Sequence, residues 1–422
     1  MFQVETMDPY QIERCERWIT DTISETNTEE FVQKRPLEDP EQSPQPDPKR
    51  PRTDLASDSR PRTPSLASPC PDVLESIPPS SSDVLTMQPD QSYSAVSGKS
   101  RTEVPLEQLE KPIFFKQEDF PALPDDVRTL WERLLSFAKF HQEIFPASIK
   151  AKVRSVVPGV PETCFQSLSQ ESTTVSWEEV EKLVRAARSC MEDSCHKSVW
   201  NFKVHYPLLE AAIRSHADAT IEVLTTTTIN DLFLPKAQSS ASDVSRTASK
   251  LIDFGVALDP DDNLKARLGG FLQELPPAEQ SINPTRSRRL RHRPIAIPIE
   301  TKSAHKPTAS GQYQLAVWIA AWHNRIARLD RSLRTPILPV ISVVGHHWDL
   351  YLAEDKGDQI IIHGPLQIGT TDGITDMYSL LECLQMLVGW ATTRHRDWVC
   401  NLIDLCERRR EEFASLSLVC GN

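Results

Sequence analysis

The sequence lacks any run of apolar residues long enough to cross a membrane, which takes about 18 consecutive residues. Its opening residues, 1–17, carry acidic side chains and contain no apolar core of the kind found in secretory signal peptides. These two absences argue against a membrane protein and against a secreted protein. We therefore expect a protein of the cell interior, in the cytoplasm unless another signal directs it elsewhere.

Positive charge is in deficit, because 47 Lys and Arg residues stand against 59 Asp and Glu residues and give a formal net charge of −12. This balance argues against a protein that coats nucleic acid through its overall charge, but it leaves room for a local basic groove. The nine cysteines show no metal-ligand spacing. The closest pair, Cys190 and Cys195, falls in a helical pattern, so we expect reduced thiols and no zinc site.

Glycine and aromatic residues are few, at 13 Gly and 7% Phe, Trp and Tyr, whereas proline is abundant at 33 residues. Prolines are frequent in residues 26–104, together with Ser, Asp and Glu and without sustained apolar periodicity. Such a segment cannot bury enough apolar surface to offset the loss of chain entropy, so we predict a disordered tail. Before it, residues 1–25 form a short segment with a helical pattern, which either docks on a partner or frays.

A compact basic cluster lies within the predicted tail, where Lys49, Arg50 and Arg52 alternate with prolines. An exposed, extended cluster of this kind is what nuclear import receptors read. The alternative is a solvated basic patch with no receptor. We favour nuclear import, which would place the protein in the nucleus.

Apolar periodicity after the tail divides the chain into two regions. Residues 105–199 indicate a helical lead-in, and residues 200–415 indicate an α/β domain in the order helix, three strands, helix, two strands, helix. An insertion over residues 263–293 interrupts the strands. The predicted helices cover residues 124–145, 264–275, 311–329 and 376–392, and one that starts at residue 200 or 207 and ends at residue 216. Another starts at a capping box formed by Ser176 and Glu179. The predicted strands cover residues 220–230, 250–258, 294–300, 339–354 and 359–363.

Two acids in predicted strands favour a metal site. Asp253 lies among apolar residues of one strand, and Glu300 follows the alternating isoleucines of another. Acidic side chains at such positions are costly to bury unless they bind a cation or are solvated. Magnesium, or manganese in its place, prefers hard oxygen ligands of this type, and the backbone carbonyl of Thr301 would add another. Lys302 points to the same face as Glu300, because strand side chains alternate.

This arrangement suits metal-dependent cleavage of a phosphodiester bond. The metal ion would lower the pKa of a bound water and neutralise charge on the scissile phosphate, while Lys302 would orient that water or stabilise the pentavalent phosphorus. The alternative is a chance triplet, since Glu354-Asp355-Lys356 repeats the Glu-x-Lys spacing in what we predict to be a polar hairpin turn. The strand setting of the first triplet favours a functional site.

At these residues the chain resembles the PD-(D/E)XK nuclease superfamily, and within it a fungal group of nuclease-like proteins of unassigned function. The resemblance covers residues 200–401 and extends to the helices from residue 124. It implies a restriction-endonuclease-like fold, with a mixed β-sheet core flanked by helices. The motifs that carry it are Lys250-Leu-Ile-Asp253-Phe-Gly, Pro298-Ile-Glu300-Thr-Lys302, Gln312-Tyr-Gln314-Leu-Ala-Val-Trp318 and Val343-Val-Gly-His346-His-Trp348.

The resemblance also implies further site residues. In the superfamily an acid on the first core helix often completes the metal site, and Glu210 is the position that matches. Gln314 resembles the glutamine of the Gln-x-x-x-Tyr helix motif of exonuclease branches, with Trp in place of Tyr. The wide spacing of Asp253 and Glu300 departs from the short hairpin common in the superfamily, so residues 263–293 are an insertion, which loops tolerate well.

The insertion carries a basic run that includes Arg288, Arg289, Arg291 and Arg293. These side chains either follow the phosphate backbone of a nucleic acid or form an exposed charged loop in an acidic protein. The sequence as a whole favours a magnesium-dependent nuclease that acts on DNA or RNA, with DNA as the expected partner. The alternative is an inactive nuclease-like module that binds nucleic acid or protein, and the oligomeric state stays open.

Overall fold

The structure is a computed structural model that describes residues 104–118, 121–167, 175–238, 252–304 and 308–420. These residues belong to one compact unit, residues 101–422. The predicted N-terminal segment, nearly all of the predicted tail, and the cluster of Lys49, Arg50 and Arg52 lie outside the described residues. What the sequence indicates about them stays a prediction.

The described residues contain α-helices, π-helical segments and short 3-10 turns. The α-helices are α2 (Asp125–Phe140), α3 (Lys150–Val156), α4 (Trp177–Glu192), α5 (Lys197–Trp200), α6 (Tyr206–Ile213), α8 (Asp262–Gln273), α9 (Thr308–Leu329), α10 (Ile374–Trp390) and α11 (Arg396–Cys420). Two π-helical segments, η4 (Asn201–His205) and η7 (Ala391–His395), join α5 to α6 and α10 to α11. Short 3-10 turns are η1 (Leu106–Gln108), η2 (Ala147–Ile149), η3 (Glu162–Cys164), η5 (Asp231–Phe233) and η6 (Pro277–Glu279).

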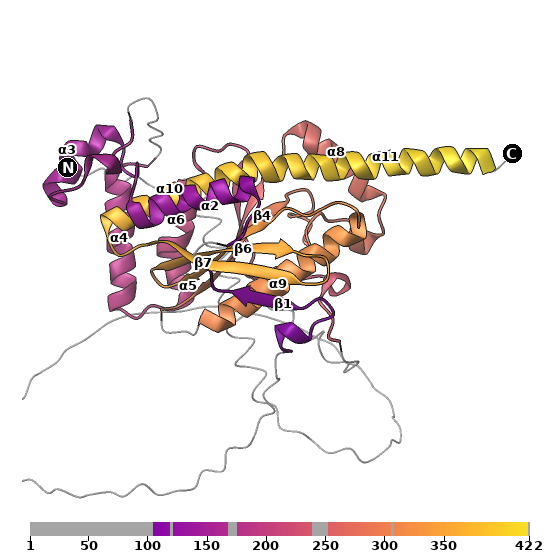
Figure 1. Ribbon diagram of the computed structural model, residues 1–422, viewed down its shortest axis with the longest axis horizontal. Coiled ribbons are helices and arrows are strands. Elements are labelled where there is room, and N and C mark those ends of the chain that lie inside the picture. The colour runs from indigo at the N-terminus through magenta and orange to yellow at the C-terminus, as the bar shows by residue number, and fades with distance from the viewer. Residues whose placement is uncertain (1–103, 119–120, 168–174, 239–251, 305–307, 421–422) are drawn as a thin grey trace, which may run out of the picture. The chain divides into compact units, whose positions relative to one another are not determined.

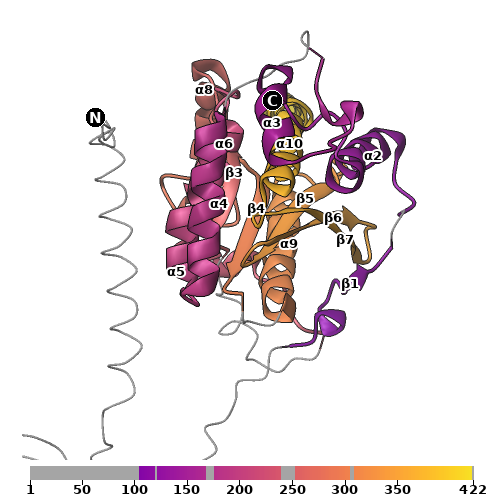
Figure 2. The ribbon, with the colours of Figure 1, turned by 90° about the vertical axis from the view of Figure 1, so that its left-hand side faces the viewer.

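One mixed sheet of seven strands forms the centre of the described unit. The strands are β1 (Ile113–Lys116), β2 (Ala219–Val223), β3 (Phe254–Leu258), β4 (Ile295–Lys302), β5 (Leu338–Val344), β6 (His347–Asp355) and β7 (Ile360–Thr370). Their order across the sheet is β1-β7-β6-β5-β4-β3-β2. Strands β1 and β7 pair in parallel, as do β4 and β5, and the other neighbours are antiparallel. Figure 2 shows the strands following one another from β3 to β1.

Two apolar clusters lie on the two faces of the sheet. In β5, Ile341 and Val343 belong to one cluster, whereas Leu338 and Val340 belong to the other, as the alternation of strand side chains requires. Side chains of α2, α4, α6 and α10 belong to the first cluster, and side chains of α8, α9 and α11 belong to the second. These helices are labelled in Figure 1. The sheet is therefore covered by helices on both faces.

The helical patterns and the mixed α/β class predicted from the sequence are confirmed. Helices α2, α4, α6, α8, α9 and α10 each fall within or across a predicted helix. The predicted capping box is present at α4, where the N–H of Glu179 donates to the Ser176 hydroxyl and the N–H of Ser176 donates to the Glu179 carboxylate. Strands β6 and β7 form the predicted hairpin through the turn after Asp355.

The predicted strand over residues 339–354 is wrong, because this run forms two strands, β5 and β6. The chain reverses at Gly345, whose φ of +55° is a left-handed conformation that glycine adopts at little cost. Strand β1 was also not expected, since the region before residue 200 was predicted to be helical. The predicted strand over residues 220–230 ends at Val223, and Asp253 lies one residue before β3.

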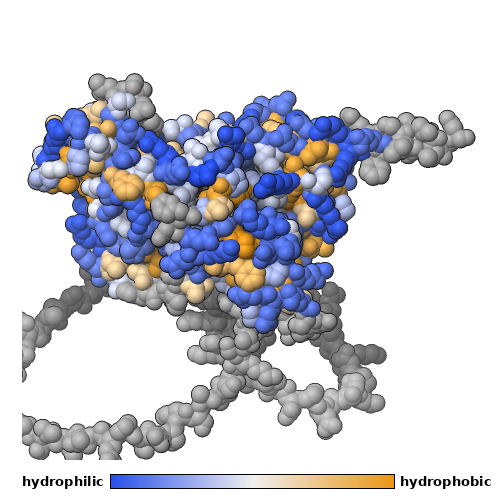
Figure 3. Space-filling view, in the orientation of Figure 1, coloured by the Kyte–Doolittle hydropathy of each residue, from blue (hydrophilic) through white to orange (hydrophobic). Residues whose placement is uncertain are grey.

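The surface of the unit is mixed in polarity. The face turned to the viewer in Figure 3 is largely hydrophilic, with hydrophobic residues in separate small groups. No helix in the part of the chain that the structure describes is long and apolar enough to cross a membrane.

Candidate active site

Glu300 and Lys302 lie on one face of β4 at its carboxyl end. The Lys302 ammonium is 2.6 Å from Oε1 of Glu300, so the same-face prediction is confirmed. The Glu300 side chain has no exposure to solvent, whereas 14% of the Lys302 side chain is exposed. The ion pair therefore lies where the end of the sheet opens toward solvent.

Asp253 approaches the same end of β4 from the neighbouring strand. It lies immediately before β3, which runs antiparallel to β4, and its backbone N–H donates to the carbonyl of Ile299. Its Oδ2 accepts the backbone N–H of Thr301 at 2.8 Å and lies 2.8 Å from the Thr301 hydroxyl. The Asp253 side chain thus continues the pairing of the two strands past the end of β3, and its carboxylate is held beside Glu300.

Lys197 joins the two acids. Its ammonium lies 2.7 Å from Oδ2 of Asp253 and 3.3 Å from Oε1 of Glu300. Lys197 is the first residue of α5, and 29% of its side chain is exposed. The sequence analysis did not identify this residue, because nothing in its local pattern distinguishes it from a surface lysine at a helix start.

Two side chains of the π-helical segment η4, those of Asn201 and His205, form hydrogen bonds beside the site. His205 Nε2 donates to the carbonyl of Gly345 at 3.0 Å, and its Nδ1 lies 3.0 Å from the side-chain amide of Asn201. Asn201 in turn lies 2.8 Å from the Thr301 hydroxyl. A single π-turn within a helix often marks a functional site. Here it places two polar side chains against β4, and through Thr301 they fix the position of Asp253.

Burial and charge set the protonation of the site. Burial raises the pKa of Glu300 to about 7, and the charge of Asp253 adds to the rise against the opposing effect of the two lysines. Burial by itself would lower the pKa of Lys197, but the carboxylates of Asp253 and Glu300 outweigh it and raise the pKa. The charged form of Glu300 is therefore favoured by the two lysines beside it.

Comparison with known proteins shows the family of the chain. A family model described as the PD-(D/E)XK nuclease superfamily matches residues 157–396. The chain belongs to the PD-(D/E)XK nuclease superfamily. The matched region contains Lys197, Asp253, Glu300, Lys302 and Gln314. A search of curated proteins and a search of solved structures each found no match.

Helix α9 places a glutamine and a glycine against Glu300 and Lys302. The Lys302 ammonium donates to Oε1 of Gln314, so Lys302 is held between Gln314 and Glu300. Gly311 lies one turn earlier, where an added Cβ would contact Glu300 Cγ at 3.6 Å and Lys302 Cε at 3.7 Å. On β5, Ser342 pairs in register with Glu300, and its buried hydroxyl has no hydrogen-bond partner.

The donor set fits a hard divalent cation. Asp253 and Glu300 converge on one point, which the Lys197 ammonium takes, and Oε2 of Glu300 is buried without a hydrogen-bond partner. Carboxylate oxygens are the ligands that Mg²⁺ and Mn²⁺ prefer. Among the described residues no group of three or more His, Cys, Asp or Glu side chains gathers around one point. The described residues thus offer a metal ion the carboxylates of Asp253 and Glu300, and metal binding by these two and by the carbonyl of Thr301 stays a prediction.

Glu210 is the helix acid that the resemblance implies as a further metal ligand. It is on α6, where its charge raises the pKa of Arg214 together with the stronger effect of Glu179. No hydrogen bond or ion pair in the described residues joins it to Asp253 or Glu300. The side chain that reaches both acids from the first core helix is Lys197, at the start of the helical segment, and the role of Glu210 as a ligand stays a prediction.

The predicted basic run divides into two parts. Arg289 and Arg293 both pair with Glu222, a buried residue of the edge strand β2, and the Arg293 guanidinium lies 2.9 Å from Oε1 of Glu222. These two arginines neutralise a buried acid. Arg288 is exposed and Arg291 is half-buried, and neither forms an ion pair among the described residues. Their role in binding nucleic acid stays a prediction.

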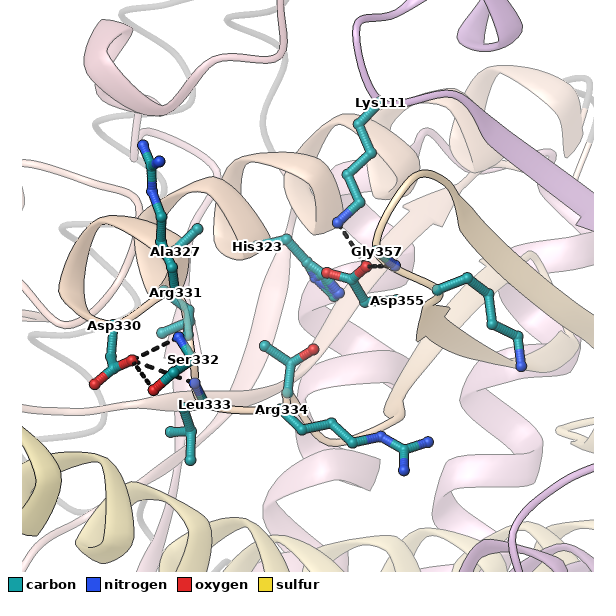
Figure 4. A pocket seen from close by; sticks show the side chains of 13 residues that line it. Lys111, His323, Ala327, Asp330, Arg331, Ser332, Leu333, Arg334, Asp355 and Gly357 are labelled. Carbon is teal, nitrogen blue, oxygen red and sulfur yellow. Dashed lines mark hydrogen bonds and ion pairs between the residues drawn. The ribbon is translucent and has the colours of Figure 1, made fainter.

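A pocket of about 440 Å³ lies at the other end of β6, at the turn into β7. Figure 4 shows Lys111 and Asp355 as an ion pair there, 2.5 Å apart, with the His323 ring of α9 directed toward them. Burial lowers the pKa of His323 to about 4, and its ring has no hydrogen-bond partner. Lys356 of the second Glu-x-Lys triplet lines this pocket, whereas Asp253 and Glu300 do not. The predicted polar hairpin turn holds only for Lys356, because Glu354 and Asp355 belong to β6 and Glu354 is buried.

Proposed function

We propose that this protein is a metal-dependent nuclease that hydrolyses phosphodiester bonds of DNA or RNA, with Asp253, Glu300 and Lys302 as its catalytic set. The observation that carries the proposal is the convergence of two buried carboxylates on one cation, with Lys302 beside them. The membership of the PD-(D/E)XK nuclease superfamily supports the same activity.

The residues of the chain have separable roles in this reaction. Asp253 and Glu300 would hold Mg²⁺ or Mn²⁺, which supplies a nucleophilic water at neutral pH and stabilises charge on the phosphate. Lys302 is fixed between Glu300 and Gln314, so its ammonium is positioned to hydrogen-bond to the attacking water or to a phosphate oxygen. The Thr301 hydroxyl contacts both Asp253 and Asn201, and these contacts hold the Asp253 carboxylate in place.

Cleavage assays with matched lysine variants test the proposal. We expect the full-length protein to cleave DNA or RNA with Mg²⁺ or Mn²⁺, and we expect Lys302→Met and Asp253→Asn to lower the rate about 100-fold or more, because each removes charge from the reacting centre. Lys356→Met is the control, since Lys356 pairs with Glu354 in the second Glu-x-Lys triplet away from the site. Circular dichroism should show that all variants fold.

The result that contradicts catalysis is also well defined. If the wild-type protein cleaves neither duplex DNA, single-stranded DNA nor RNA with either metal, the enzymatic proposal is wrong. Binding of nucleic acid that survives Glu300→Ala would then support an inactive nuclease-like module. That module is the second reading of the same fold.

The basic run gives a prediction about where nucleic acid binds. We expect Arg288→Gln to weaken binding without loss of stability, because Arg288 is exposed and forms no ion pair among the described residues. Arg293→Gln should instead destabilise the protein by roughly 1–3 kcal/mol, since it removes a partner of the buried Glu222. Filter binding and urea unfolding separate the two effects. Equal loss of binding in both folded variants would show that the whole run contacts nucleic acid.

Nuclear localisation completes the proposal. It is supported by the sequence of the cluster at Lys49, Arg50 and Arg52, which has the composition that import receptors bind. A fluorescent fusion with all three residues changed to alanine should lose nuclear accumulation. Unchanged accumulation would show that the cluster is not the signal.

A further inference from the structure

Lys197 lies at the place that a shared metal ion would take. Its ammonium is 2.7 Å from Asp253 and 3.3 Å from Glu300, and no other lysine or arginine among the described residues forms ion pairs with both acids. Of the two acids, Lys302 forms an ion pair with Glu300 only, and its ammonium also donates a hydrogen bond to Gln314. The two lysines therefore differ in what they do: Lys302 is fixed at the side of the pair, and Lys197 bridges it.

When both acids are ionised, two carboxylates stand against two ammonium groups and the charges of the cluster balance. A divalent cation added to this buried site would then leave an excess of positive charge. One ammonium has to withdraw before the metal is held well. Lys197 is the group able to do so, because 29% of its side chain is exposed compared with 14% for Lys302.

The position of Lys197 on its helix favours the same conclusion. It is the first residue of a helical segment that continues through η4 into α6. The positive end of a helix dipole lies at its N-terminus, where a cation gains nothing from the helix. The ammonium is thus held by the two carboxylates and not by the helix. A cation of higher charge that binds those carboxylates would displace it.

We propose that Lys197 is the resident cation of the Asp253–Glu300 pair and that a divalent metal ion binds this site by displacing it. The inference rests on the proposed function for the metal site itself. Lys197 keeps the two buried acids together when no metal is bound, and it lowers the affinity of the site for metal. It is a positioning residue of the resting site.

Metal binding measured without nucleic acid tests this directly. Free Mn²⁺ is followed by electron paramagnetic resonance as it is titrated into full-length wild-type protein and into Lys197→Met, Lys302→Met and Lys203→Met. We expect Lys197→Met to bind Mn²⁺ about tenfold more tightly than wild type, because the competing charge is gone. Lys302→Met should give a smaller increase, since Lys302 contacts one acid only.

Lys203→Met is the matched control, because Lys203 is an exposed residue of η4 and the substitution changes the net charge equally. Its affinity for Mn²⁺ should stay within about twofold of wild type. Adding Asp253→Asn to Lys197→Met should abolish the tight binding, which places the metal at the acid pair. Equal affinities of wild type and Lys197→Met, an equal increase in Lys203→Met, or no binding by Lys197→Met would each overturn the proposal.

Thermal unfolding provides a second readout. Lys197→Met leaves two buried acids short of a cation, so its unfolding temperature should fall without metal and rise more with Mn²⁺ than that of wild type. If this variant does not fold, Lys197→Gln is measured in the same way. A protein that shows this pattern but cleaves no nucleic acid would overturn the proposed catalysis while supporting the displacement of Lys197.

Discussion

Glu300 has two oxygens with different surroundings. Oε1 lies close to both Lys197 and Lys302, whereas Oε2 is buried and has no hydrogen-bond partner. A buried carboxylate oxygen without a partner is costly unless something satisfies it. A bound ligand that contacts Oε2 of Glu300 would therefore remove this cost.

Gly311 gives a prediction at the scale of a single residue. A Cβ added here would lie 3.5 Å or more from Ser342, Glu300 and Lys302, which is ordinary contact. We expect Gly311→Ala to stabilise the protein by about 1 kcal/mol, because alanine favours the helix more than glycine does. Urea unfolding measures the change. A loss of stability would show that the helix lies closer to β4 than these distances indicate.

The turn between β5 and β6 holds the site together at the scale of elements. Gly345 donates its N–H to the carbonyl of Lys302 at 3.0 Å, and its own carbonyl accepts a hydrogen bond from Nε2 of His205. A single turn residue thus connects the end of β4 to the π-helical segment η4. The strand that carries Glu300 and Lys302 and the π-helical segment η4 meet through this turn.

Gly345→Ala should therefore be more damaging than a glycine change in an ordinary turn. Its φ is +55°, and an added Cβ would lie 2.8 Å from Cβ of Ala304. We expect a loss of roughly 2–4 kcal/mol in the free energy of unfolding, from backbone strain and the clash together. Gly357→Ala is the control, because Gly357 has a φ of +95° but open space around it. Its expected loss is roughly 1–2 kcal/mol, and equal losses would contradict the role of the clash.

The elements that the sequence predicted are those with a local pattern of their own. The capping box of α4 and the alternating isoleucines of β4 are signals contained in a few consecutive residues. The reversal at Gly345 was missed because one glycine in an alternating run also suits a continuous strand. Strand β1 was missed because it has four residues and pairs only with β7, far along the chain.

The candidate site was predictable to the same extent. Alternation along β4 was enough to place Glu300 and Lys302 on one face, whereas the position of Asp253 depends on the pairing of β3 with β4. Lys197 was not predictable, because its position depends on how α5 packs against the end of the sheet. Arg289 and Arg293 could not be separated from Arg288 either, since their buried partner lies on another strand.

The stability of the whole molecule should fall in acid, partly because of His395. Its ring is buried between Trp390 and Trp398 and has no hydrogen-bond partner. Burial lowers its pKa from 6.5 to about 3. Below pH 6.5 the unfolded chain therefore binds a proton that the folded chain does not, and stability falls as the pH drops toward 3.

We expect the substitution His395→Phe to remove this dependence. The histidine costs about 2 kcal/mol at pH 5 and almost nothing at pH 7.5, from about 1.4 kcal/mol per pH unit below its unfolded pKa. Phenylalanine keeps the stacking with the two tryptophans and does not titrate. Urea unfolding at the two pH values measures the difference. An equal loss of stability in wild type and variant between pH 7.5 and pH 5 would rule out His395 as a source.

The parallel pairing of β1 with β7 has a consequence for how the chain is made. Ile113 lies beside Ile360 in the finished sheet, although most of the described chain separates them in sequence. During synthesis residues 113–116 emerge early, and β1 cannot pair with β7 until residue 360 and the rest of β7 have left the ribosome. The edge of the sheet is thus closed late, after the strands that carry the carboxylates have been made.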